Sequence, residues 1–390
     1  RLGGDEFVVI QRLLPDGSEY AGAHTLHPPL YYLILLPFYA VLRGLPEAWT
    51  WHALRVLSLL FCLAALPLIY QIAWRAGRGT AGNGNVWLAR LATAQLALLP
   101  IFGMTSGVIN NDSLQLLLVT LFLWLLSVQY PQERSLRSAL ILGVVFGLGA
   151  MTKATALICD GVALVLYLLA QDGRAVWRSR RAWERLGVTL LVGVLIGGFW
   201  YARNLALYGE LTPVEGGYTS PLLPSPDNGM LVMMLHDNFP RLFAYANWGI
   251  FYSLWSQKDW IPEAVRQPIY WVLLAYCLPA LLRILRRGDK ATSQERLATW
   301  PAYGAFGATW LACLFMALFK HWGWAEGGRY LLPALPGFSL FLARGWRGFA
   351  GERSLPVLCG IWIAAMLALN ALAIYWLFSY LNPTFGPHGL

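Results

Sequence analysis

Two acidic residues near the start of the chain have the types and spacing to do chemistry. Asp5 and Glu6 precede an apolar-periodic segment that reaches Leu14, a pattern that predicts a short amphipathic helix. A carboxylate in this place can act as a general base or bind a divalent metal ion, or it can complement the dipole of a first helical turn. His27 follows in a His-Pro-Pro-Leu stretch whose prolines fix the start of the next apolar segment. His27 is therefore either a structural histidine or a further ligand.

Three cations at the ends of apolar stretches are candidates for binding phosphate. Lys153 stands seven residues before Asp160, so the two lie on one helical face, as an ion pair or with Lys153 holding a phosphate. Arg203 either snorkels to lipid headgroups or has the same role. Arg329, followed by Tyr330, stands at the start of a predicted helix, where the helix dipole opposes a cation. An anion held by Arg329 and free helix N–H groups resolves that conflict.

Four further polar residues lie at the ends of apolar stretches. Asn111 and Asp112 open such a stretch, either as a cap with an acid in the first turn or as part of a site. His321 and Glu326 lie in the turn that also carries Arg329. These residues are predicted to lie near a substrate or a metal ion.

The amino-acid composition indicates the kind of fold that positions these side chains. Of the 390 residues, 57% are hydrophobic and only 13% are charged, about half of what soluble domains carry. This excludes a soluble enzyme, a disordered chain and a disulfide-stapled scaffold, and the five cysteines all fall inside apolar stretches. We therefore predict an all-α fold, a polytopic bundle of transmembrane helices.

Ten stretches are long enough to cross a bilayer, which takes about 20 apolar residues. They are 51–74, 86–106, 112–130, 136–152, 154–171, 186–206, 268–286, 299–319, 329–346 and 355–381. A further apolar stretch, Leu30–Leu42, has only thirteen residues and contains Pro37. It is too short to span, so we predict an interfacial or re-entrant helix there.

The basic residues test this count through the positive-inside rule. If the loops after the odd-numbered spans are cytoplasmic, 18 of the 29 Lys and Arg residues lie on that side. The candidate residues then all converge on the outer face, and the net charge of +9 reflects topology, with no indication of nucleic-acid binding. With the chain starting outside, we expect an additional N-terminal span ahead of it, which makes eleven.

This topology divides the chain into three parts. Residues 1–50 form an outer-face loop with juxtamembrane helices, residues 51–381 the transmembrane bundle, and residues 382–390 an outer tail. The bundle includes a long outer loop, 208–267, whose aromatic run from Phe243 to Trp260 either rests at the membrane interface or contributes to function.

The order of these motifs resembles integral-membrane glycosyltransferases of the GT-C superfamily, in particular the protein O-mannosyltransferase and aminoarabinose transferase group and related bacterial membrane proteins. The resemblance covers nearly the whole chain. It rests on Asp5-Glu6, HPPLYYLILLPFYAVLRGL from His27, WHALR from Trp51, Asn111-Asp112, GLGAMTKATAL (147–157), WYARNLALYGELTP (200–213), NWGIFYSLW (247–255) and GRYLLPALPGF (328–338). Each motif is weak alone, and the ensemble specifies the superfamily but no substrate.

The resemblance implies an inverting transfer of a sugar from a polyprenyl-phosphate lipid to an acceptor, in the inner membrane of a bacterium with the site facing the periplasm or exterior. It implies that Asp5 is the general base and that Glu6 supports it or binds a divalent metal, Mg or Mn, together with His27. It further implies that Arg329, with Lys153, Arg203 and Tyr330, holds the donor phosphate. Membrane lipids are the other expected partners.

One departure from the family pattern leaves the acceptor open. The aminoarabinose branch has Lys-Pro-Pro-Leu where this chain has His27-Pro28-Pro29-Leu30, which is closer to the mannosyltransferase branch. Two other classes remain as alternatives: a transporter or lipid-linked sugar flippase, and a non-catalytic membrane scaffold subunit. A transporter typically has repeats and broken helices at the midplane, whereas the unusual charges here gather at one face.

Overall fold

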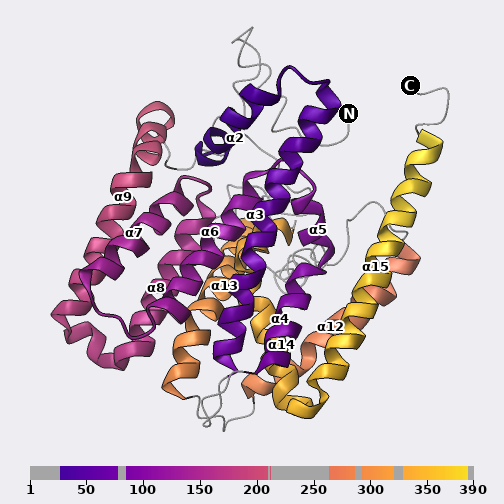
Figure 1. The fold of residues 1–390 in the computed structure, drawn as a ribbon. Helices are drawn as coiled ribbons and strands as arrows, with labels where there is room; N and C mark the ends of the chain where they lie inside the picture. Colours follow the sequence, from indigo (N-terminus) through magenta and orange to yellow (C-terminus); the bar gives the residue numbers. More distant parts are fainter. Residues whose placement is uncertain are drawn as a thin grey trace.

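The computed structural model describes residues 27–77, 85–209, 211, 263–285, 292–319 and 328–384 (Figure 1). Every regular element in these ranges is helical, which confirms the all-α prediction. The elements are α2 (Leu30–Leu42), α3 (Glu47–Ala76), α4 (Val86–Ala97), α5 (Pro100–Ser106), α6 (Asn111–Trp124), η2 (Leu125–Gln129), α7 (Leu136–Ala150), α8 (Thr155–Asp172), η3 (Gly173–Arg178), α9 (Arg180–Tyr208), α12 (Glu263–Leu285), α13 (Ser293–Phe319), η5 (Gly328–Ala334), α14 (Leu335–Ala350), η6 (Glu352–Ser354) and α15 (Leu355–Thr384).

All ten ranges predicted as spans contain helix. Among the described residues, five helical stretches are each long and apolar enough to cross a membrane: Glu47–Ala76, Asn111–Gln129, Thr155–Asp172, Arg180–Tyr208 and Glu352–Leu372. The predicted span 86–106 is not one straight helix, because α4 and α5 meet at a bend of 62°. Pro100 begins α5, and its missing N–H interrupts the hydrogen bonds of a continuous helix. Counted as one broken span, this pair makes a sixth.

The short apolar stretch forms α2 with the predicted bounds, Leu30–Leu42. The helix lies at one end of the bundle, which we call the α2 end (Figure 1). Tyr31 and Leu35 are its buried residues, and the Tyr31 hydroxyl lies 2.7 Å from Ser58 Oγ of α3. The backbone N–H of Leu30 donates to the Met151 carbonyl at 3.0 Å. The start of α2 is thereby attached to the turn between α7 and α8.

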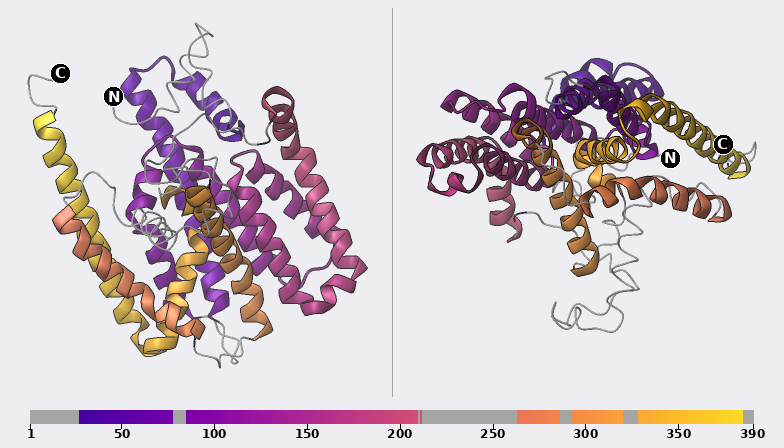
Figure 2. Two further views of the ribbon diagram at one scale, coloured as in Figure 1. Left: turned by 180° about the vertical axis from the view of Figure 1, so that it is seen from behind. Right: turned by 90° about the horizontal axis from the view of Figure 1, so that it is seen from below.

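Two groups of helices flank the centre of the bundle. Seen from behind, α7, α8 and α9 lie along one side and α12 and α15 along the other, with α3, α6, α13 and α14 between them (Figure 2).

The contact between α7 and α9 is built on glycines. A Cβ at Gly147 would lie 2.7 Å from Ile196 Cβ, and one at Gly193 would lie 2.4 Å from Phe146 Cδ1. Small residues allow this close approach of membrane helices. The Tyr201 hydroxyl of α9 then donates to the Ala150 carbonyl at 2.7 Å, next to the α7–α8 turn.

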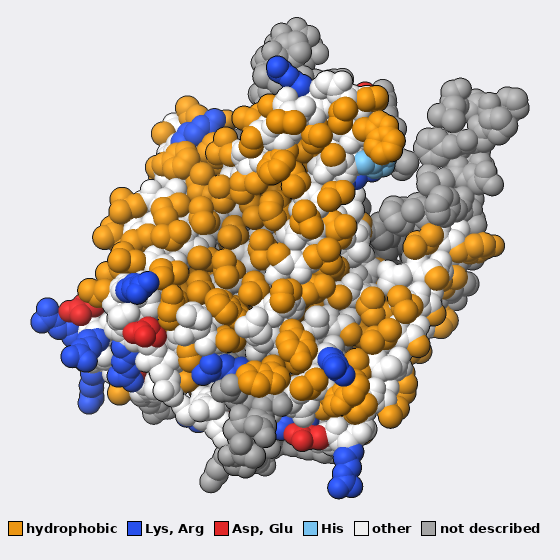
Figure 3. Space-filling view, viewed as in Figure 1, with side chains coloured by type: hydrophobic (Ala, Val, Ile, Leu, Met, Phe, Trp, Pro, Cys, Tyr) orange, Lys and Arg blue, Asp and Glu red, His pale blue; other side chains and the backbone are white. Residues whose placement is uncertain are grey.

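Apolar and basic side chains are segregated on the surface. Apolar side chains cover the flank of the bundle, and most Lys and Arg side chains in view gather at the end opposite α2 (Figure 3). This is the distribution that the predicted alternation of loops requires.

Candidate functional site

A buried ion pair lies at the α2 end of the bundle. The Lys153 ammonium contacts Oδ1 of Asp112, and the side chains are only 9% and 1% exposed. Asp112 is in the first turn of α6 and Lys153 is in the α7–α8 turn, 41 residues later. Charged groups inside a membrane bundle are expensive unless they are paired, and they usually mark functional sites.

The predicted pairing of Lys153 with Asp160 is wrong, because Lys153 pairs with Asp112. The expectation assumed one continuous helix through both residues. Helix α8 starts only at Thr155, and the Lys153 N–H donates to the Gly149 carbonyl within the preceding turn. The side chain of Lys153 therefore points to α6 and does not follow the face of α8 that carries Asp160.

The start of α6 is capped by the residue ahead of the helix, and Asp112 follows in the first turn. The N-cap is Asn110, whose side chain accepts from the Asp112 N–H at 2.8 Å. Asn111 is fully buried, and its side-chain amide lies 3.5 Å from the Thr152 carbonyl in the turn that carries Lys153. The predicted capping of this helix is confirmed, with Asn110 in that role.

Tyr330 brings a third segment to the pair. Its ring, 9% exposed, lies in η5, and the Lys153 ammonium is 5.0 Å from the ring centroid. We call Asp112, Lys153 and Tyr330 the Lys153 cluster. Arg329 precedes Tyr330 in η5, and its side chain lies outside the described part of the structure. Its phosphate-binding role stays a prediction, now at a position adjacent to this cluster.

Arg203 is held in a different environment. Its Nη1 donates to Asn204 Oδ1 at 2.9 Å, and its guanidinium lies 4.7 Å from the Trp200 ring and 5.9 Å from the Tyr208 ring. None of its described contacts involves the Lys153 cluster. Stacking on aromatic rings at the end of α9 is how a snorkelling arginine sits at a membrane interface.

The other predicted residues fall partly outside the described ranges. Asp5, Glu6, His321 and Glu326 lie outside them, so their roles stay predictions. His27 is half-buried directly ahead of α2, which is bonded to the Met151 carbonyl two residues before Lys153. The structure thus brings Asn111, Asp112, Lys153 and Tyr330 together.

Two buried polar residues near the cluster were not predicted as site residues. Gln115 is fully buried in α6 and donates to the Thr155 hydroxyl at the start of α8. Asp160 is fully buried in α8, and neither carboxylate oxygen has a hydrogen-bond partner among the described residues. Gln115, one turn after Asn111, could have been found as a polar residue continuing the first turns of an apolar stretch. Asp160 was also noticed in the sequence, as an acid inside an apolar stretch, but it was interpreted only as an ion-pair partner of Lys153.

A metal centre is not apparent in the described part of the chain. Within these ranges, no three or more His, Cys, Asp or Glu side chains are grouped so as to hold a metal ion. The predicted metal ligands Asp5 and Glu6 lie outside the described residues, so this site with His27 stays a prediction.

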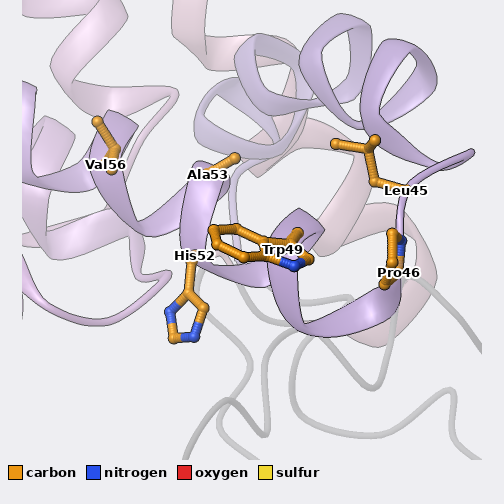
Figure 4. Close-up of a pocket in the computed structure, with 6 residues that line it drawn as sticks. All are labelled: Leu45, Pro46, Trp49, His52, Ala53 and Val56. Atoms are coloured by element: carbon orange, nitrogen blue, oxygen red, sulfur yellow. The ribbon is translucent and has the colours of Figure 1, made fainter.

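An apolar pocket of about 600 Å³ lies at the start of α3 (Figure 4). It is lined by Leu45, Pro46, Trp49, His52, Ala53 and Val56. His52 is the ionisable residue in this lining, and no lining residue belongs to the Lys153 cluster. A wall of this kind fits hydrocarbon and offers little for recognition of a polar group.

Part of the chain is similar to a known protein family. Residues 26–200 match the model of the family described as dolichyl-phosphate-mannose-protein mannosyltransferase, a GT-C family. The matched segment runs from the residue before His27 through most of α9 and includes Asp112 and Lys153. Over this part of the chain, the match agrees with the resemblance found in the sequence. No curated protein matches the chain by sequence.

Two crystal structures of ArnT from Cupriavidus metallidurans are similar to the structure described here. The complex with undecaprenyl phosphate has a TM-score of 0.44 and 15% identity, covering 91% of this chain and 65% of ArnT. The apo structure has a TM-score of 0.37 and 15% identity, covering 82% of this chain and 66% of ArnT. This chain thus spans about two thirds of the length of ArnT.

Proposed function

We propose that this chain is a membrane glycosyltransferase that moves a sugar from a polyprenyl-phosphate donor to an acceptor at the outer membrane face, with inversion. The family match over residues 26–200 supports the reaction class. The observation that carries the proposal is the Lys153 cluster, a buried cation beside a tyrosine at the α2 end of a membrane bundle. The expected location is the inner membrane of a bacterium, with the site facing the periplasm or exterior.

The cluster suits a phosphate leaving group. When the bond between sugar and phosphate breaks, negative charge grows on the phosphate, and a fixed cation stabilises that state more than the bound substrate. The Lys153 ammonium has three N–H donors. One is directed to Asp112, which leaves others for phosphate oxygens, and the buried position strengthens each of these bonds. In the proposal, Arg329 and Tyr330 complete the phosphate site, and Arg203 attracts the lipid headgroup from the interface.

Proton removal from the acceptor is assigned to the N-terminal acids. A single base suffices for inversion with an external acceptor hydroxyl. Asp5 is the proposed base, and Glu6 supports it or binds a divalent metal together with His27. The hydrogen bond from the Leu30 N–H to the Met151 carbonyl supports this assignment, because it holds the start of α2, which the acids precede in the chain, beside the turn of Lys153.

The test uses the full chain in lipid nanodiscs and undecaprenyl phosphate as the probe, titrated by native mass spectrometry. Because Lys153→Met alone would remove the cation that the buried Asp112 contacts, the informative variant is Asp112→Asn combined with Lys153→Met. Charge-assisted hydrogen bonds contribute about 1.5–3 kcal/mol, so we expect affinity to fall at least about tenfold. Arg353→Gln, an exposed arginine at the opposite end, is the control and should bind as the unmodified chain does.

Unchanged binding by the folded double variant would remove the phosphate site from the Lys153 cluster. The catalytic step is tested separately with Asp5→Asn. This variant should lose sugar transfer from a polyprenyl-phosphate donor and keep undecaprenyl phosphate binding. Full transfer activity in Asp5→Asn would exclude Asp5 as the base.

A further inference from the structure

A second concentration of unusual side chains lies at the end of the bundle opposite α2, where η3 leads into α9. The segment from Trp177 to Trp183 contains two tryptophans and three exposed arginines. We call it the arginine–tryptophan corner: Trp177, Arg178, Arg180, Arg181 and Trp183. The proposed glycosyl transfer makes no use of these residues.

The backbone of the corner is held rigidly. Gly173 adopts a φ of +57°, which a residue with a side chain rarely does, and so turns the chain out of α8 into η3. Ser179 caps α9 by accepting from the Ala182 N–H at 3.3 Å. The buried Arg185 bonds to the Gln171 side chain at 3.0 Å and the Tyr167 hydroxyl at 3.2 Å, both in α8. The corner is thus attached to two membrane helices.

Two indole rings are displayed on this rigid turn. The rings of Trp177 and Trp183 lie 5.9 Å apart, and Trp183 Nε1 donates to the Trp177 carbonyl at 3.2 Å. The residues nevertheless remain 56% and 49% exposed. Exposed tryptophans at the ends of membrane helices lie at the level of the lipid headgroups, where the ring is partly in hydrocarbon and the N–H reaches polar atoms.

The arginines around these rings are exposed, and two of the three form no ion pair within the described part of the chain. Arg180 pairs with Glu184, but its side chain is 92% exposed. Arg178 and Arg181 are exposed and form no ion pair with any described residue. Arg180 and Arg181 also occupy the first turn of α9, where the helix dipole disfavours cations. A negatively charged group bound here would neutralise the arginines and would also offset their unfavourable interaction with the helix dipole.

Neighbouring charges add to the same field. Arg134 and Arg137 are also exposed near this end, and of the local acids, Asp172 pairs with Arg134 and Glu184 with Arg180. Glu133, the third acid, bonds to the Ser135 N–H at 3.1 Å. Figure 3 shows basic side chains concentrated at this end of the molecule. The local potential is therefore positive at the depth of the headgroups.

We infer that the arginine–tryptophan corner binds the headgroup of an anionic glycerophospholipid. A lipid phosphodiester offers oxygens that guanidinium groups bind in pairs, and its acyl chains place it beside the indole rings. A soluble phosphate would match the arginines alone and would leave the tryptophans without a role. The inference is independent of the proposed glycosyl transfer, because its residues lie at the other end of the bundle.

The experiment measures lipid bound to the purified full chain by native mass spectrometry, with phosphatidylglycerol and phosphatidylcholine as probes. We expect phosphatidylglycerol to bind more tightly. Arg178→Gln with Arg181→Gln should weaken its binding about 30-fold, since each guanidinium that contacts the bound headgroup should contribute about fivefold. The matched control is Arg353→Gln, which removes an exposed arginine from another part of the same end and should have little effect.

Three results would overturn the inference. One is equal binding of the two lipids by the unmodified chain. Another is a loss in Arg353→Gln as large as in the double variant, which would indicate a diffuse charge effect. The third is displacement of phosphatidylglycerol by inorganic phosphate at equal concentration, which would indicate a simple anion site. The lipid site is supported if the unmodified chain prefers phosphatidylglycerol to phosphatidylcholine and only the double variant loses phosphatidylglycerol binding.

Discussion

Breaking the Lys153–Asp112 pair from one side should strongly destabilise the fold. Lys153→Met removes the ammonium and leaves the Asp112 carboxylate, whose side chain is 1% exposed, without its cation. Asp112→Asn removes the carboxylate and leaves the Lys153 ammonium, whose side chain is 9% exposed, without that anion. In each case a buried charge loses the opposite charge that it contacts in the described structure. The double variant removes both charges and replaces them with neutral groups of similar size.

The expected magnitudes follow from burial. Unit charges about 4 Å apart attract by about 4 kcal/mol at an effective dielectric constant of 20, and removing one partner of a buried pair costs about 3–5 kcal/mol. The double variant should recover most of this loss, because replacing both charges is often close to neutral. With each single variant losing about 3–5 kcal/mol and the double variant close to neutral, a double-mutant cycle should give a coupling energy of at least about 5 kcal/mol. The exposed pair Arg180–Glu184 is the control and should give less than about 1 kcal/mol.

The assay is unfolding of the purified chain in mixed micelles, with increasing sodium dodecyl sulfate and helicity read by circular dichroism. Single and double variants of both pairs are compared under one condition. If Lys153→Met and the double variant lose the same stability, or if the two pairs give equal coupling energies, the burial argument is refuted. In that case water or lipid headgroups must reach the Lys153 cluster.

Two further predictions concern helix packing and a buried acid. Gly193→Val should destabilise the α7–α9 contact by about 1–3 kcal/mol, since a Cβ would lie 2.4 Å from Phe146 Cδ1, whereas Gly161→Ala has open space and should be neutral or stabilising; the same unfolding assay compares them. Asp160→Ala should raise stability by about 1–3 kcal/mol, because the buried carboxylate has no hydrogen-bond partner in the described structure. Loss of stability in Asp160→Ala would show that the carboxylate has a stabilising partner.

Sequence reasoning succeeded where local rules decide the structure. Leu30–Leu42 was predicted as a separate short helix from its length and its preceding prolines, and α2 has these bounds. All ten apolar stretches are helical, since apolar composition and length are properties of each stretch alone. The bend at Pro100 was missed, although proline in an apolar stretch is a visible signal.

The candidate site could be predicted only in part. Lys153, Asp112 and Tyr330 were each selected as polar residues at the end of an apolar stretch. Their contact depends on how α6, the α7–α8 turn and η5 pack, which the spacing in the sequence does not contain. The error on Asp160 has the same origin, because a spacing of seven residues predicts a shared face only within one helix.

Helix α6 has a consequence for how the protein responds to its membrane. In the span Asn111–Gln129, 78% of the most apolar window is buried inside the protein, against 22% in Arg180–Tyr208. A bilayer of different thickness acts on the helices that face lipid, which respond by tilting. Helix α6 is surrounded by other helices, so it meets protein where α9 meets lipid. The polar first turn of α6, with Asp112, is thereby insulated from changes in lipid composition that the outer helices must absorb.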